Sequence, residues 1–232
     1  MCVRVCKRFA PSPPLNFTVI PRCSAMTSRV SRLDADASNG YERVAQEFIA
    51  TRRDSRVGVE AVLTWAHCLP PGAAILDLGC GFGMPISGAL MKAGKVVYGV
   101  EASATLCAAF RANFPHVPIA CESVEESSFF GRTFEGALAW GLMFLLSGDS
   151  QVELIGRMAA VLEPGGRLLF TSPAQACRWV DVLTGRKSQS LGAVKYEATI
   201  EATGLVLAPG CTDEGENHYY HAVKPPRAVA AI

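Results

Sequence analysis

The spacing of apolar residues along the chain changes near residue 70. Before that point they recur at the three- and four-residue intervals of helices: Val44, Phe48, Ile49, Val59, Val62, Leu63 and Ala66. Asn39 and Glu42 form a capping-box pattern at the start of the first helix, and a Leu-Pro-Pro-Gly stretch ends the second, at about 57–68. We expect two helices ahead of the main fold.

After residue 70, apolar runs of strand length alternate with helix-length segments. Strands are predicted at 73–79, 95–100, 117–121, 134–140 and 166–172, and helices at 85–93, 103–113 and 150–162. Such alternation is typical of βαβ units in a parallel sheet with right-handed crossovers. Two further strand-like runs in 204–223 have no helix between them and predict an antiparallel hairpin. The predicted fold is therefore α/β: a doubly wound, seven-stranded, mostly parallel sheet with an antiparallel C-terminal hairpin. The polar segment 175–192 is predicted to be a loop over the pocket.

The chain has 232 residues, half of them apolar, which is enough for one substantial core. Residues 1–33 contain six Lys or Arg, no acid and a Pro-rich stretch, so we predict a disordered basic tail over 1–37. Three interpretations of this segment stay open: an inert tail, a targeting segment, or translation that begins upstream of a natural start at Met26. We divide the single domain 38–232 into lid helices (38–70) and a Rossmann-like core (71–224).

Charge and composition narrow the partners. The net charge of +1 provides no field that attracts nucleic acid or an anionic membrane. The longest apolar stretch, 137–146, is about half of the roughly 20 residues that a membrane-spanning helix needs. Nine cysteines without a Cys-x-x-Cys pair favour a reducing cytoplasm and no metal site. A small-molecule substrate is therefore the class of partner that these observations leave open.

The loop after the first strand is unusually rich in glycine. The sequence LDLGCGFG places Gly79, Gly81 and Gly83 two residues apart, beginning two residues after Asp77. Glycine permits a tight turn and lets the backbone approach a ligand closely. The dinucleotide pattern Gly-x-Gly-x-x-Gly would need its third glycine at Met84, so a pyrophosphate site is disfavoured.

An acid at the end of the next strand supports a nucleotide site. Glu101 lies 20 residues beyond Gly81, where a carboxylate can accept hydrogen bonds from two ribose hydroxyls. Together with the segments FEGALAWGLMFLL (134–146) and LEPGGRLLFTSP (162–173), LDLGCGFG and GVEAS resemble the class I S-adenosylmethionine-dependent methyltransferases over roughly residues 40–224.

The resemblance implies methyl transfer from S-adenosyl-L-methionine to a small molecule. It also implies a set of cofactor-binding residues: Asp77, Gly79, Cys80, Gly81, Gly83, Glu101, Ala102, Glu122, Ser123, Val124 and Trp140. Many members of the family have an Asp after the third strand, whereas this chain offers Glu122, Glu125 and Glu126; we favour Glu122. A nicotinamide-dependent oxidoreductase and a non-catalytic cofactor-binding module are the alternatives.

Candidate catalytic residues come from the two ends of the domain. His218 and Tyr219 belong to DEGENHYYHAV (213–223), the densest polar and aromatic cluster of the chain, and alternate residues there face opposite sides of a strand. Tyr41 lies on the first helix, which in this family commonly covers the site. Trp140 is either a contact of the cofactor or acceptor or a buried core residue.

Overall fold

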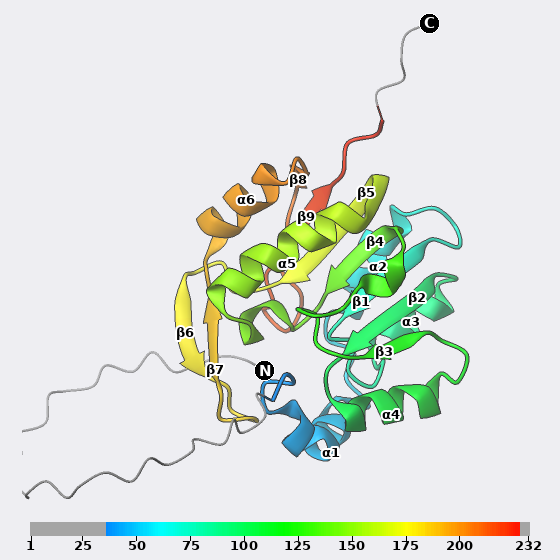
Figure 1. Ribbon diagram of the computed structural model, residues 1–232, viewed down its shortest axis with the longest axis vertical. Helices are drawn as coiled ribbons and strands as arrows, with labels where there is room; N and C mark the ends of the chain where they lie inside the picture. Colours follow the sequence, from blue (N-terminus) through cyan, green and yellow to red (C-terminus); the bar gives the residue numbers. More distant parts are fainter. Residues whose placement is uncertain (1–35, 228–232) are drawn as a thin grey trace, which may run out of the picture. The chain divides into compact units, whose positions relative to one another are not determined.

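The computed structural model describes residues 36–227, and nearly all of the predicted tail lies outside the described residues. Its main sheet has seven strands in the order β3-β2-β1-β4-β5-β9-β8 (Figure 1). The strands are β1 Ala74–Leu78, β2 Val96–Glu101, β3 Ile119–Cys121, β4 Phe134–Ala139, β5 Leu162–Thr171, β8 Val206–Ala208 and β9 Tyr219–Val223. The five strands β1 to β5 run parallel to one another, and β9 is antiparallel to both β5 and β8. The predicted fold class is confirmed.

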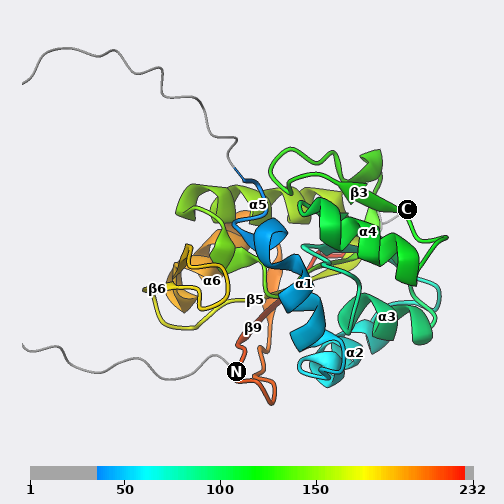
Figure 2. The same ribbon diagram turned by 90° about the horizontal axis from the view of Figure 1, so that it is seen from below.

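Helices cover both faces of the sheet (Figures 1 and 2). They are α1 Tyr41–Arg52, α2 Val59–His67, α3 Ile86–Lys92, α4 Ala104–Asn113, α5 Gly148–Val161 and α6 Ala193–Ala202, with 3₁₀ turns η1 Phe129–Gly131 and η2 Met143–Leu145. None of the described helices is long and apolar enough to cross a membrane.

Strand β1 shows why the sheet needs two helical layers. All five of its residues are buried. Leu76 packs in a core cluster with residues of α5 and α6, whereas Ile75 packs in another with residues of α2 and α3. A strand covered on both faces reads as a continuous apolar run, which is the pattern of parallel sheets.

Two local predictions are wrong, and one helix was not predicted. Segment 175–192 is not an irregular loop, because β6 Cys177–Val180 and β7 Lys187–Ser190 pair as an antiparallel hairpin. Helix α6 follows that hairpin and was not predicted. The capping box of α1 does not form: Ser38 Oγ accepts the Glu42 N–H at 2.9 Å, and the Glu42 carboxylate binds elsewhere.

Candidate active site

The strand order reverses between β1 and β4, since β1 leads outward to β2 and β3 whereas β4 leads to β5 on the other side. In open α/β sheets, ligands bind at the carboxyl ends of the strands beside such a reversal. The glycine-rich loop follows β1 at this edge. Gly79 and Gly81 have φ of +65° and +57°, a region that glycine enters at little cost. The loop is held to β2 by the N–H groups of Gly79 and Cys80, both of which donate to Val100 O.

Glu101 lies directly beneath this loop at the end of β2. Its two carboxylate oxygens accept the N–H of Gly81 at 2.9 Å and the N–H of Ser103 at 2.8 Å. The side chain is 7% exposed, and burial raises its pKa. No described Lys or Arg is paired with it. Each oxygen keeps a second lone pair, so the carboxylate can still accept two hydroxyl hydrogen bonds, as the two hydroxyls of a ribose require.

Asp77 is a second buried acid in the same place. It is 2% exposed and accepts a hydrogen bond from Ser87 Oγ at 2.6 Å. Burial raises its pKa to about 7, and the nearby charge of Glu101 adds to this effect. Two acids without a basic partner among the described residues form an environment that favours a cationic ligand group.

The remaining predicted residues of the glycine loop pack against the protein. A Cβ on Gly83 would come within 2.5 Å of Phe114 Cε2, so this glycine allows α4 to pack closely. The Cys80 side chain lies against Gly99, and burial raises its pKa well above the usual value. Ala102 is half-buried beside Glu101.

The segment after β3, where we predict the adenine contacts, forms one helical turn. Ser123 Oγ accepts the Glu126 N–H at 3.2 Å, and Val124 is buried in the core. Glu122 is half-buried, and its N–H donates to Glu101 O at 3.0 Å.

Arg157 of α5 holds this turn from behind. Its guanidinium donates to Val124 O at 2.6 Å, to Glu125 O at 2.8 Å and also to Ser127 O, and it lies over the Phe129 ring at 4.3 Å. These carbonyls would otherwise be left unpaired at the end of the turn. Sequence reasoning missed Arg157, because nothing local links it to a segment about 30 residues away.

Helix α1 is fastened next to Glu101. The Glu42 carboxylate accepts hydrogen bonds from Ser103 Oγ at 2.5 Å and from Thr105 Oγ1 at 2.7 Å. Phe48 is placed over the glycine loop, since a Cβ on Gly81 would lie 3.4 Å from its ring. Tyr41, a predicted catalytic residue, packs edge-on against Phe48 with ring centroids 5.2 Å apart.

At the end of β4, Trp140 belongs to a hydrogen-bonded chain. Its indole N–H donates to the Tyr219 hydroxyl at 2.8 Å, and this hydroxyl donates to Asp213 Oδ2 at 2.7 Å. Burial raises the pKa of Tyr219, and the Asp213 carboxylate raises it further. The hydroxyl therefore keeps its proton at neutral pH and donates it in the hydrogen bond to Asp213, and the arrangement fixes the plane of the Trp140 ring.

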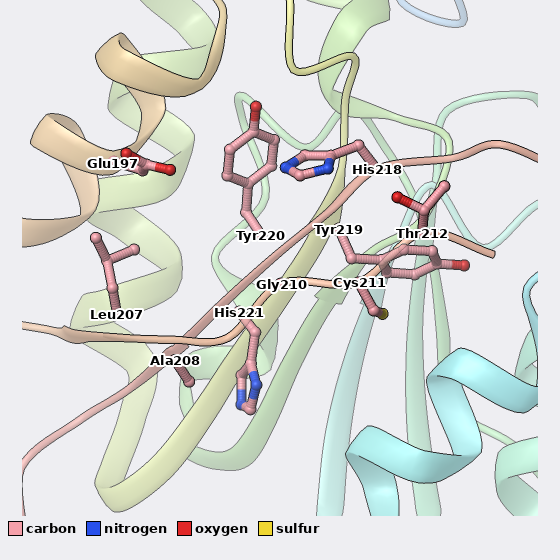
Figure 3. Close-up of a pocket in the computed structure, with 10 residues that line it drawn as sticks. All are labelled: Glu197, Leu207, Ala208, Gly210, Cys211, Thr212, His218, Tyr219, Tyr220 and His221. Carbon is pink, nitrogen blue, oxygen red and sulfur yellow. The ribbon is translucent and has the colours of Figure 1, made fainter.

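The structure separates His218 from this chain. Its ring packs edge-on against Tyr220 at 4.8 Å, on the opposite side of the strand from the Tyr219 ring (Figure 3). His218 lines a cavity of about 230 Å³ between α6 and the β8–β9 connection. Residues of the glycine loop and Glu101 do not line this cavity. Among residues 36–227, no group of three or more His, Cys, Asp or Glu could hold a metal ion.

Comparisons with known proteins agree with this fold. Residues 75–166 match the model of a methyltransferase domain. Aklanonic acid methyltransferase DauC of Streptomyces sp. (strain C5) is 25% identical over 158 residues, 65% of this chain and 67% of the relative. The structure of the CcbJ methyltransferase from Streptomyces caelestis aligns with a TM-score of 0.65 at 18% identity, over 83% of this chain and 98% of that one. The S-adenosylmethionine-bound CalS10, an amino pentose methyltransferase from Micromonospora echinaspora, aligns at 0.61 and 16% identity, over 77% and 96%.

The seven-stranded sheet and the glycine-rich first loop define the class I methyltransferase fold. The chain carries a methyltransferase domain of this class. It is an S-adenosylmethionine-dependent methyltransferase, with S-adenosylmethionine as its cofactor.

Proposed function

We propose that the protein methylates a small-molecule acceptor that binds at the carboxyl ends of β4 and β5, against Trp140. The observation that carries the proposal is Glu101: a buried carboxylate beneath the glycine loop, with two free acceptor positions and no basic partner among the described residues. The relative DauC is named as a methyltransferase of aklanonic acid, which supports a small-molecule acceptor here.

The proposed cofactor site runs along the ends of three strands. Asp77, Gly79 and Gly81 would surround the methionine portion, Glu101 the ribose, and the turn at 122–124 the adenine. When bound, S-adenosylmethionine supplies an electrophilic methyl group on a positively charged sulfur. The buried carboxylate of Asp77 would stabilise positive charge there, because an opposite charge favours its ionised form.

The remaining side chains would act by positioning and by excluding water. Phe48 covers the glycine loop, and Glu42 anchors α1, the helix that carries it. Trp140 would form one wall of the acceptor site, with its ring plane fixed by Tyr219. The β6–β7 hairpin would form another wall, since its Trp179 contacts Phe144 of η2 with centroids 5.4 Å apart.

The two alternative functions differ in their ligands. A nicotinamide-dependent oxidoreductase would bind NADH, and a non-catalytic module would bind S-adenosylmethionine without converting it. The comparisons favour neither. We also propose a cytoplasmic location, supported by the free thiols of Cys68, Cys80, Cys107, Cys121 and Cys211.

Calorimetric titration with S-adenosylhomocysteine and with NADH tests the cofactor. We expect micromolar binding of the first and none of the second; the reverse result would contradict the proposal. Formation of S-adenosylhomocysteine in the presence of small-molecule extracts then tests turnover. Binding without turnover in any extract would favour the non-catalytic module.

A further inference from the structure

Arg52, the last residue of α1, points into the proposed active site. Its guanidinium carbon lies 5.4 Å from the centroid of the Trp140 ring and 6.0 Å from that of the Phe48 ring. The side chain is half-buried. It therefore lies between the cover of the glycine loop and the wall of the proposed acceptor site.

The guanidinium has no counterion among the described residues, and its only recorded partners are the two rings. Two acids on the connection before β9, Asp213 and Glu214, accept hydrogen bonds from other groups. Asp213 accepts hydrogen bonds from Tyr219, from the Gly215 N–H and from Asn217. Glu214 Oε1 accepts the Gly58 N–H at 3.3 Å.

The remaining charges nearby do not neutralise this cation. Asp54 is exposed and forms no ion pair with Arg52 in the described part of the chain, and Arg53 and Arg56 add positive charge on the same connection between α1 and α2. A partly desolvated guanidinium gains most from a planar anion such as a carboxylate, which it can bind through two parallel hydrogen bonds.

From these contacts we infer that the acceptor carries a carboxylate or a similar planar anion, which Arg52 binds from its position over the Trp140 ring. This inference rests on the proposed function and names the substrate class of that site. Arg52 is the specificity-determining residue. The indole plane is already fixed by Tyr219, so the guanidinium and the ring form a site for a charged group on a flat molecule.

The cofactor also has a carboxylate, on its methionine portion, so the test must separate two sources of the same chemistry. The position of Arg52 favours the acceptor. Its guanidinium is nearer to the ring of Trp140, which ends β4, than to that of Phe48, which covers the glycine loop.

The experiment uses the full chain saturated with S-adenosylhomocysteine and two probe pairs: salicylate with salicylamide, and 1-naphthoate with 1-naphthamide. Calorimetry should show that the acid of at least one pair binds about tenfold or more tightly than its amide, equivalent to about 1.4 kcal/mol. In Arg52→Gln this ratio should fall to about one. Arg53→Gln, on the exposed neighbour, is the matched control and should keep the wild-type ratio.

Three results would overturn the inference. The first is an acid-to-amide ratio near one for both pairs in the wild type, and the second is an unchanged ratio in a folded Arg52→Gln protein. The third concerns the cofactor arm, in which S-adenosylhomocysteine is compared with methylthioadenosine, which lacks the amino-acid portion. If Arg52→Gln weakens only the first by about tenfold, Arg52 binds the cofactor carboxylate instead. Failure of the wild type to bind S-adenosylhomocysteine would instead overturn the proposed function itself.

Discussion

Replacing Glu101 with alanine is expected to weaken both folding and cofactor binding, by separable amounts. In the folded protein the carboxylate accepts the N–H groups of Gly81 and Ser103 in a site that is 7% exposed. An unsatisfied buried donor costs about 1–3 kcal/mol. Removal of a desolvated carboxylate offsets part of that cost, since burial raises its pKa. We therefore expect the free energy of unfolding to fall by about 2–4 kcal/mol.

The effect on binding should be larger. Two charge-assisted hydrogen bonds to the ribose contribute roughly 1.5–3 kcal/mol each, so the affinity for S-adenosylhomocysteine should fall about 100-fold or more. Glu101→Gln keeps one acceptor oxygen but turns an amide N–H₂ towards one of the two backbone donors. It should give an intermediate loss in both quantities.

Urea melts of the apo proteins and calorimetric titrations at a temperature where each variant is folded measure the two effects separately. Glu125→Ala, an exposed acid on the neighbouring turn, is the control and should change neither quantity by more than about 0.5 kcal/mol. If folded Glu101→Ala binds S-adenosylhomocysteine as tightly as the parent, the ribose assignment is refuted.

Three further variants test other parts of the site. Asp77 has a pKa of about 7 in the apo protein, so its ionisation destabilises the apo fold as pH rises from about 4 to 7, whereas a bound sulfonium favours the ionised form. The affinity for S-adenosylmethionine, measured by calorimetry, should rise between pH 6 and 8, and the affinity for S-adenosylhomocysteine should change less. Asp77→Asn should remove this difference between the two ligands. Equal pH profiles of the two affinities in the parent protein would argue against this role of Asp77. Gly81→Ala should lose about 1–2 kcal/mol of stability, because its φ is +57°, and should weaken cofactor binding; unchanged affinity would place the ligand elsewhere. Arg157→Met should weaken S-adenosylhomocysteine binding about tenfold and raise the rate of amide hydrogen exchange in the turn at 123–127. Addition of 10 mM guanidinium, but not of urea, should partly restore binding. An unchanged exchange rate in this turn would refute the role of Arg157.

The sequence predicted those parts of the site that depend on local patterns. A buried strand followed by closely spaced glycines specifies a turn at the carboxyl edge of a parallel sheet, and the alternation of strands and helices places Glu101 beside it. The structure brings Glu101 within 2.9 Å of the Gly81 N–H, as this argument requires. The periodicity of apolar residues and the turn preference of glycine were sufficient to predict this contact, because the glycine loop and the strand after it are close in sequence.

Elements held by distant contacts could not be predicted in this way. The β6–β7 hairpin lacks a clear apolar alternation and is held by contacts such as the Arg43 hydrogen bond to Thr184 O at 2.8 Å. Arg52 and Arg157 are ordinary helix-surface residues by sequence. Their surroundings come from tertiary packing, which brings Trp140 to one and the turn after β3 to the other.

Transfer of an isotopically labelled methyl group tests the central claim most directly. The protein is incubated with S-adenosylmethionine labelled on its methyl group and with a metabolite extract, and the small-molecule fraction is analysed by mass spectrometry. With the parent protein we expect a labelled small molecule and an equal amount of S-adenosylhomocysteine. With folded Glu101→Ala we expect both products to be lost. Equal label transfer by the parent and by Glu101→Ala, or binding of NADH in place of S-adenosylmethionine, would contradict the central claim.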